Sequence, residues 1–219
     1  MSNETGKPPI RVLTVTMSDT RKRSNDESGR ALVEELVAGG VKHVRHVILR
    51  EEPRFLQELV RSVSTDNAAD AVVVTGGTGI TPRDTTFEAL REIFDKDIVG
   101  FGETFRRLSW EQIGPHSILS RASAGVVNEC LVFSLPGSTR AVRLGVRELI
   151  LPILGHAVDL AMGRSTHVPT APPPPYSSPG SDGRLPAPSD PRMASDPRLA
   201  SDPRMMPPSD SKIRPPSSE

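Results

Sequence analysis

The residues best suited to chemistry are three glycines and a carboxylate: Gly76, Gly77 and Gly79 stand within four positions, and Asp84 follows. Glycine permits positive φ and lets the backbone pass close to a ligand. An apolar run over 71–74 precedes this loop, and apolar residues at helical spacing follow it. The unpaired N–H groups at the start of such a helix would favour an anion. The pattern predicts a phosphate site with one acidic side chain beside it, unless the glycines serve only a tight strand-to-helix turn.

The residues after the loop exclude two common phosphate motifs. No Gly-Lys-Ser/Thr follows the glycines, as a P-loop requires, and Thr81-Pro82 stands where a dinucleotide-binding fingerprint needs its third glycine. A helix is still predicted to follow, because Thr85 and Glu88 have the spacing of a capping box ahead of an apolar face.

A second glycine corner follows the apolar run over 130–135. Its residues are Pro136, Gly137, Ser138 and Thr139. Ser138 is a natural N-cap for the helix that begins next. If the strands are parallel, both corners lie at one edge of the sheet, together with Ser18 and Glu51, which also follow predicted strands. Ligands of open α/β sheets bind at that edge.

Hydrophobic periodicity and turn residues predict an alternating α/β chain with a domain over 10–164. Strands are expected over 10–16, 41–49, 71–74, 126–127 and 130–135, with a tight turn joining the last two. Helices are expected over 30–37, 55–63, from Thr85 onward, 97–108, 117–124 and 141–162, with Pro152 bending the last. Bare apolar strands are typical of a parallel sheet that is buried on both faces.

Several polar side chains have two interpretations. Ser18 and Asp19 either face a ligand or cap the turn after the first strand. Arg121 is either a phosphate clamp or an ion-pair partner, and the basic run 21–23 is expected to be a solvated loop. The carboxylates after the second strand, such as Glu51, suit either a cation or the approach to a helix.

Two further expectations concern packing. His43 and His46 are three positions apart in a predicted strand, so they should point to opposite faces and cannot chelate a metal together. Trp110 is expected to anchor the packing of its helix.

Composition limits the class of protein. The chain of 219 residues is 36% hydrophobic and 25% charged with a net charge of zero, which argues against nucleic-acid binding by bulk charge. A single cysteine, Cys130, excludes an internal disulfide and fits a reducing cytoplasm. The first residues lack the apolar segment of a secretory signal, and no apolar run approaches the length of a membrane span, so no membrane partner is expected.

The two ends of the chain differ from the middle. Residues 1–9 are predicted to form a flexible arm, and residues 165–219 hold 15 of the 22 prolines and a six-residue repeat that begins SDPR. The repeats start at Ser189, Ser195 and Ser201. Such a segment cannot bury enough apolar surface to fold and should be disordered. It serves either as a docking or phosphorylation segment or as an extension with no partner.

Four motifs together resemble the MoaB/Mog family of molybdenum-cofactor biosynthesis proteins, which is related to the G domain of gephyrin. They are TGGTG at 75–79 with Asp84 beyond it, GFGETFR at 100–106, LSRA at 119–122 with Gly125, and LPGSTRA at 135–141. The resemblance covers residues 8–163, and the Pro-Gly-Ser-Thr form is similar to the MoaB branch in particular.

The resemblance implies a three-layer α/β/α sandwich that forms a trimer or a dimer of trimers and binds molybdopterin. Active members adenylate molybdopterin with Mg-ATP and release pyrophosphate. Asp84 would hold Mg²⁺, with Glu51 standing where established adenylyltransferases carry a second aspartate. The residues expected to bind substrate or phosphate are Ser18, Thr75, Gly76, Gly77, Thr78, Gly79, Pro136, Gly137, Ser138 and Thr139.

Three functions remain open on the sequence. The first is a molybdopterin adenylyltransferase, working with other proteins of the cofactor pathway. The second is a carrier that binds molybdopterin without catalysis, which the glutamate at position 51 favours. The third, a dinucleotide-binding oxidoreductase, is disfavoured by the broken glycine spacing.

Overall fold

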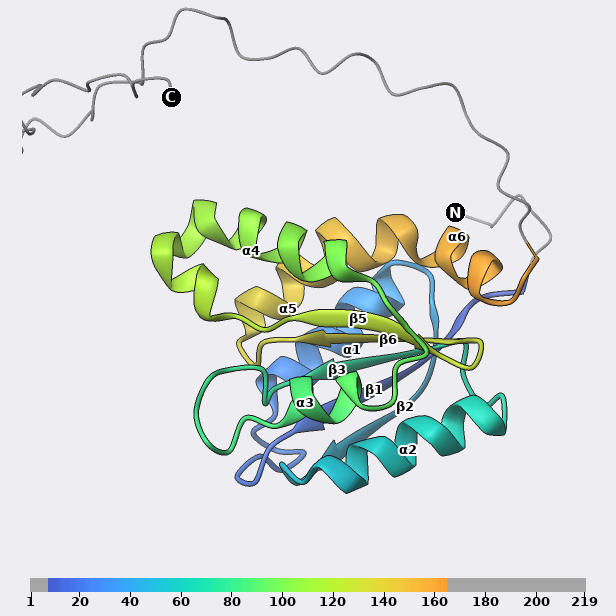
Figure 1. The fold of residues 1–219 in the computed structure, drawn as a ribbon, viewed down its shortest axis with the longest axis horizontal. Coiled ribbons are helices and arrows are strands. Elements are labelled where there is room, and N and C mark those ends of the chain that lie inside the picture. Colours follow the sequence, from blue (N-terminus) through green and yellow to red (C-terminus); the bar gives the residue numbers. More distant parts are fainter. Residues whose placement is uncertain (1–7, 165–219) are drawn as a thin grey trace, which may run out of the picture. The chain divides into compact units, whose positions relative to one another are not determined.

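The structure, a computed structural model, describes residues 8–164, so the predicted tail and most of the predicted N-terminal arm lie outside the described residues. A six-stranded sheet in the order β2-β1-β3-β6-β5-β4 runs through the middle (Figure 1). The strands are β1 Arg11–Met17, β2 Lys42–Leu49, β3 Ala71–Thr75, β4 Lys96–Asp97, β5 Ser123–Val127 and β6 Cys130–Leu135. The α-helices are α1 Glu27–Ala38, α2 Pro53–Thr65, α3 Thr86–Arg91, α4 Val99–Ile113, α5 Thr139–Gly145 and α6 Leu151–Ala161.

The sheet is mostly parallel, as predicted. β1 pairs in parallel with β2 and β3, and β3 pairs in parallel with β6. β5 runs antiparallel to β6, because the two strands are joined by a two-residue turn in which Asn128 has a φ of 53°. The carboxyl ends of β1, β2, β3 and β6 therefore meet at one edge of the sheet.

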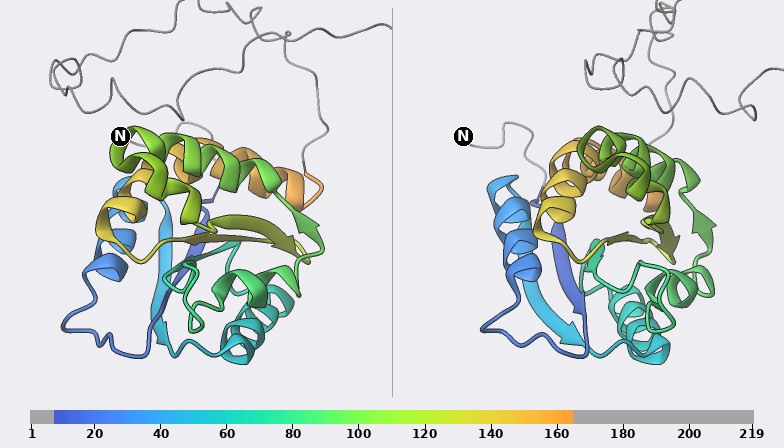
Figure 2. Two further views of the ribbon diagram at one scale, coloured as in Figure 1. Left: turned by 60° about the vertical axis from the view of Figure 1, so that its left-hand side comes forward. Right: turned by 90° about the vertical axis from the view of Figure 1, so that its left-hand side faces the viewer.

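Helices cover both faces of the sheet, which confirms the predicted three-layer arrangement (Figures 1 and 2). α1, α4, α5 and α6 pack on one face, and α2 and α3 pack on the other. Successive residues of β3 alternate between the two cores: Val73 belongs to the first cluster, whereas Val72 and Val74 belong to the second. Every residue of β3 and β6 is buried, as expected for central strands that lie between two helical layers.

The predicted helix over 117–124 is wrong. Residues Gly114–Leu119 form a 3₁₀ helix, η1, and β5 begins at Ser123. The backbone of Arg121 donates to the carbonyl of Thr78 (3.1 Å), so the intervening segment is extended against the glycine loop. A tertiary contact overrides the local helical preference here.

The predicted capping box and the predicted packing role of Trp110 are also wrong. Thr85 precedes α3 but makes no capping hydrogen bond, and its hydroxyl is buried without a partner in the described residues, while Glu88 turns to Arg121. Trp110 is 52% exposed on the outer side of α4, which continues to Ile113, beyond the predicted end at 108. Trp110 therefore does not anchor the core.

The two histidines of β2 share a face, contrary to the prediction. The register shifts between Val12 and Thr14 of β1, so a β-bulge adds one residue to β2 between His43 and His46. Both rings then reach the hydroxyl of Thr14, at 3.0 Å from His43 Nε2 and 2.9 Å from His46 Nδ1. Among the described residues, no group of three or more histidine, cysteine or acidic side chains is arranged to hold a metal.

A π-helical turn lies just before Pro152, the residue at which a bend is predicted. Residues Val146–Ile150 form this turn, η2, between α5 and α6. Proline has no N–H and its ring crowds the carbonyl four residues earlier, so the helix widens just before it.

Two observations concern the remaining sequence expectations. No helix within residues 8–164 has both the length and the apolar character needed to cross a membrane. Cys130 is buried in β6, and this burial, with the charge of Asp70 nearby, raises the pKa of its thiol to about 12. The cysteine is therefore an inert strand residue at neutral pH.

Candidate functional site

The two glycine corners touch each other. The backbone N–H of Gly76 donates to the carbonyl of Leu135 (3.0 Å), and the Thr75 hydroxyl donates to the carbonyl of Pro136 (3.0 Å). A Cβ placed on Gly137 would lie 3.3 Å from the Cα of Gly76. The parallel pairing of β3 with β6 thus joins two turns that are about sixty residues apart in the chain.

The first corner needs glycine for its own conformation. Gly76 and Gly77 have φ values of 98° and 64°, and a Cβ on Gly76 would lie 2.4 Å from the carbonyl oxygen of Met17. A Cβ on Gly77 would lie 2.3 Å from the Thr86 hydroxyl, which donates to the carbonyl of Gly76 (2.9 Å). The structural role of these glycines and a role in binding are compatible, because the same backbone lines a cleft.

The cleft has a volume of about 520 Å³ and opens at the carboxyl edge of the sheet, the edge that faces the viewer in the right-hand panel of Figure 2. It collects eleven of the twelve predicted site residues. They are Ser18, Glu51, Thr75, Gly76, Gly77, Thr78, Gly79, Asp84, Pro136, Gly137 and Ser138. Thr139, the first residue of α5, does not line it. Ser138 is the N-cap of α5, as predicted, and its hydroxyl accepts from the N–H of Ala141 (3.2 Å).

Asp84 is held on the loop by Thr81. The Asp84 carboxylate accepts from the Thr81 N–H (2.8 Å) and the Thr81 hydroxyl (2.6 Å). Burial alone would raise the pKa of Asp84. The hydrogen bonds from Thr81 and from the N–H of Gly79, together with the charge of Arg121, have a larger opposite effect, so the pKa of Asp84 lies below its usual value. Asp84 is therefore a fixed anion at neutral pH.

Glu51 differs from Asp84 in its electrostatic environment. Burial raises the pKa of Glu51, and the negative charges of Asp19 and Asp84 raise it further, while the charge of Arg83 partly opposes them. A cation placed between the carboxylates would relieve this repulsion. Mg²⁺ typically takes one or two protein carboxylates and completes its shell with water and substrate phosphates, so this pair suits it.

Arg121 braces the glycine loop from behind. Its guanidinium donates to the carbonyls of Gly79 (2.8 Å) and Asp84 (2.9 Å) and forms an ion pair with Glu88. Arg121 does not line the cleft. Of its two interpretations, the structure supports the ion-pair partner.

Ser18 and Asp19 organise the turn after β1. The Ser18 hydroxyl accepts from the N–H groups of Thr20 and Arg21, both at 3.2 Å, so Ser18 caps the turn as well as lining the cleft. Asp19 accepts from the N–H of Glu51 (3.3 Å) and forms an ion pair with Arg83 (2.5 Å), the residue before Asp84. One aspartate therefore ties together the loops that carry the two candidate metal ligands.

The sequence did not identify the upper wall of the cleft. This wall comes from α4 and η1, and its residues are Phe105, Ser109, Ile113, His116, Leu119 and Ser120. Three of these positions, Phe105, Leu119 and Ser120, fall inside the GFGETFR and LSRA motifs, which was the available signal. Arg21, expected in a solvated loop, also lines the cleft.

With this geometry established, comparison with known proteins gives the family. The family described as a probable molybdopterin binding domain matches residues 11–156, which include every residue that lines the cleft. The chain belongs to this family. The resemblance seen in the sequence motifs is thereby confirmed.

The relatives agree with this assignment. Molybdenum cofactor biosynthesis protein B of Bacillus cereus is 45% identical over 148 residues, covering 67% of this chain and 88% of the relative. A crystal structure of a molybdenum cofactor biosynthesis protein B has a TM-score of 0.69 at 43% identity, covering 71% of this chain and 98% of that one. The tungsten cofactor synthesizing protein MoaB of Pyrococcus furiosus has a TM-score of 0.64 at 35% identity, with coverages of 73% and 99%. The chain is a MoaB-type member of the molybdenum cofactor biosynthesis proteins.

Proposed function

We propose that this chain adenylates molybdopterin with Mg-ATP and releases pyrophosphate. The observation that carries the proposal is the contact between the two glycine corners, with Asp84 and Glu51 on the rim of the same cleft. Such a cleft offers backbone N–H groups to two phosphorylated ligands at once. The family membership supplies the pathway in which such ligands occur.

The reaction needs positioning and charge neutralisation more than proton transfer. An oxygen of the molybdopterin phosphate attacks the α-phosphorus of ATP, a new P–O bond forms, and the bond to pyrophosphate breaks with its electron pair. The attacking phosphate oxygen is already ionised at neutral pH, so no general base is required. Mg²⁺ would neutralise charge on the nucleotide phosphates.

The residues divide between the two ligands. In the first corner, the N–H groups of Gly77 and Thr78 would hold nucleotide phosphates, because those of Gly76 and Gly79 already donate to Leu135 and Asp84. The second corner, with Ser138, would hold molybdopterin or its phosphate. Asp84 and Glu51 are the residues that would hold Mg²⁺, because both are carboxylates on the cleft and the charge of Asp84 raises the pKa of Glu51. Holding both ligands in line lowers the barrier by removing their freedom of motion.

We also propose an assembly and a compartment. The resemblance suggests a homotrimer or homohexamer, and the exposed apolar side chains Val99, Trp110 and Ile118 around α4 are candidates for contacts with other copies. The single cysteine suits a reducing cytoplasm.

The second candidate is a carrier that binds molybdopterin without transferring adenylate. One observation favours it: Glu51 is one methylene longer than the aspartate of established adenylyltransferases, and its raised pKa weakens it as a metal ligand. A carrier would bind molybdopterin tightly and release no pyrophosphate from ATP.

The test is formation of adenylyl-molybdopterin by the purified full chain with molybdopterin, ATP and Mg²⁺. Asp84→Asn should lower turnover by about a hundredfold or more, because one fixed negative charge beside the phosphates is lost. The amide oxygen can still accept both bonds from Thr81, so the loop should keep its shape. Asp66→Asn, at the C-terminal end of α2 and away from the cleft, is the matched control. Equal turnover by the wild type and Asp84→Asn would refute the assigned role, and tight binding without pyrophosphate release would favour the carrier.

A further inference from the structure

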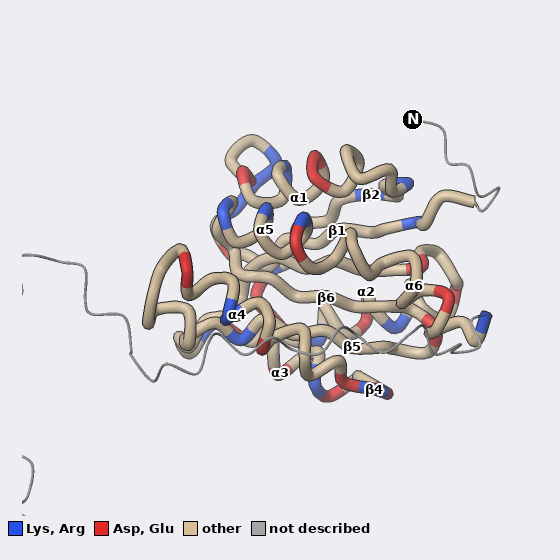
Figure 3. Tube along the Cα trace, turned by 90° about the horizontal axis from the view of Figure 1, so that it is seen from above, with Lys and Arg blue, Asp and Glu red and all other residues tan. Residues whose placement is uncertain are grey.

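The cleft is poor in positive charge for a site that takes phosphates. Among the described residues that line it, Arg21 and His116 are the basic side chains, whereas Glu51 and Asp84 are acidic. Figure 3 shows both signs of charge interspersed along the chain in the view from above, so a single cation inside the cleft matters more than a general positive field.

Three other arginines near this edge, Arg83, Arg50 and Arg121, are already paired with carboxylates. Arg83 lies 2.5 Å from Asp19, and Arg50 lies 3.9 Å from the same carboxylate. Arg121 is bound to Glu88 and to two backbone carbonyls. The positive charge of each of these guanidinium groups is therefore offset by a carboxylate.

Arg21 has a different set of contacts. Its Nη1 donates to the backbone carbonyl of Asn25 (2.6 Å), and its own N–H donates to the Ser18 hydroxyl. The Asn25 side chain in turn accepts from the N–H of Lys22 (2.6 Å), so the loop around Arg21 is closed by its own hydrogen bonds. Within residues 8–164 no carboxylate pairs with Arg21, and most of its five N–H donors remain available.

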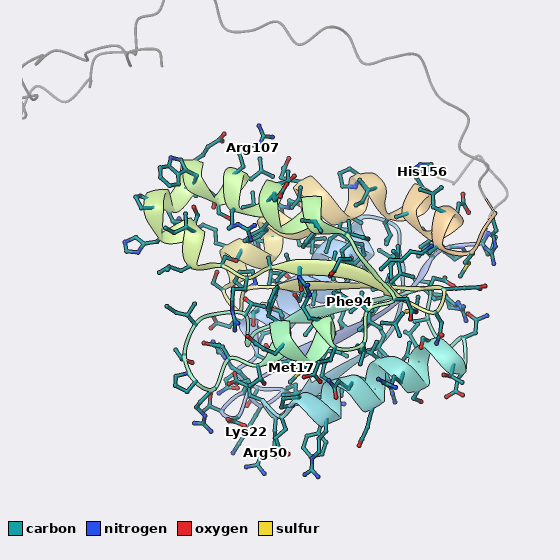
Figure 4. All side chains as sticks on the ribbon, viewed as in Figure 1. Met17, Lys22, Arg50, Phe94, Arg107 and His156 are labelled. Carbon is teal, nitrogen blue, oxygen red and sulfur yellow. The ribbon has the colours of Figure 1, made fainter. Side chains whose placement is uncertain are left out.

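The position of Arg21 indicates which part of a ligand it meets. Figure 4 shows Lys22 and Arg50 close together at the lower margin of the domain, just beyond the ends of β1 and β2. Arg21 follows β1, the strand next to β2, and Glu51 follows β2, whereas the second glycine corner follows β6 on the other side of β3. Arg21 is therefore on the side of the cleft with the candidate metal ligands, away from the corner assigned to molybdopterin.

We propose that Arg21 is a catalytic residue that binds the β- and γ-phosphates of the nucleotide and stabilises the pyrophosphate as it leaves. This inference rests on the proposed adenylyl transfer. A guanidinium presents a planar fork that matches two phosphate oxygens, and it is placed where negative charge accumulates on the leaving group. Its anchor on Asn25 reduces the freedom that the side chain loses on binding.

The experiment compares Arg21→Gln and Arg21→Lys with Arg23→Gln in the full chain. Arg23 is in the same loop, carries the same charge and does not line the cleft, so it controls for bulk charge. Calorimetry with Mg-pyrophosphate should show binding weakened about tenfold to a hundredfold by Arg21→Gln, with partial recovery in Arg21→Lys. Affinity for molybdopterin alone should be unchanged. Where turnover is measured, KM for ATP should rise and kcat should fall in Arg21→Gln only.

Several outcomes would overturn the inference. Equal weakening by Arg21→Gln and Arg23→Gln would indicate a bulk-charge effect, and unchanged pyrophosphate binding would remove the role altogether. Loss of molybdopterin binding or a lowered unfolding midpoint in Arg21→Gln would indicate a structural role for the loop. If the wild type binds Mg-pyrophosphate through Arg21 but forms no adenylated product, the proposed transfer fails and the anion-binding role stands.

Discussion

The substitution Gly76→Ala tests whether the first glycine corner is built around close backbone contact. Gly76 has a φ of 98°, where an L-residue is strained, and an alanine Cβ would lie 2.4 Å from the carbonyl oxygen of Met17. The neighbouring atom belongs to the backbone of a buried strand and cannot rotate away. We therefore expect a conformational penalty of about 1–2 kcal/mol and a further overpacking penalty of about 1–3 kcal/mol.

Gly40→Ala separates these two effects. Gly40 has a φ of 83°, but no atom lies within 4 Å of an added Cβ. This variant should lose only the conformational part, about 1–2 kcal/mol. The difference between the two variants therefore measures the clash with Met17, which we expect to be at least about 1 kcal/mol.

The measurement is chemical denaturation of both variants and the wild type, with the slope of unfolding free energy against denaturant checked for constancy. Each kcal/mol corresponds to a shift of about 2–4 °C in the thermal midpoint for a domain of this size. Equal destabilisation by Gly76→Ala and Gly40→Ala would refute the close approach of the glycine corner to Met17. Gly76→Ala should also lower the affinity for Mg-pyrophosphate, because the shifted loop carries the N–H groups of the cleft.

Two further changes follow from the electrostatics of the site. The pKa of Glu51 is raised in the folded protein, so folding favours the protonated form of this side chain. The resulting stabilisation is present below the ordinary pKa of glutamate and is lost as the pH rises through the raised pKa of the folded state. Glutamine is always neutral, so Glu51→Gln should be more stable than the wild type at pH 7 and equally stable near pH 4, as measured by urea denaturation at both pH values. A stability difference that grows toward acidic pH would contradict a raised pKa of Glu51. Arg121→Ala removes two charged hydrogen bonds to the glycine loop, so it should lower the free energy of unfolding by about 2 kcal/mol and weaken the binding of Mg-pyrophosphate. An unchanged affinity for Mg-pyrophosphate would show that the loop keeps its shape without Arg121.

Local sequence patterns were sufficient where each residue's conformation depends on its neighbours in the chain. The apolar runs of β3 and β6, the glycines that follow β3 and the N-cap at Ser138 were all predictable, because strand burial, positive φ and helix capping have short-range signatures. The placement of the two corners together also followed from the sequence once the strands were assumed to be parallel.

The missed features depend on contacts between distant segments. The bulge that brings His43 and His46 together arises from pairing with β1, and no local pattern in β2 indicates it. The expected capping box failed because Glu88 pairs with Arg121, more than thirty residues away. The wall formed by α4 and η1 was missed for the same reason, since its position over the cleft is set by packing on the sheet.

The bulge in β2 has a consequence for how copies of this chain can meet. β2 lies at one margin of the sheet and β4, with only two residues, lies at the other. A long straight margin invites another molecule to add a strand, but an extra residue bends β2, and Lys42 and Arg45 add exposed charge to it. Neither edge strand is therefore suited to pairing with a strand of another molecule. Subunits should associate through helices and loops, and the sheet should not extend from one subunit into the next.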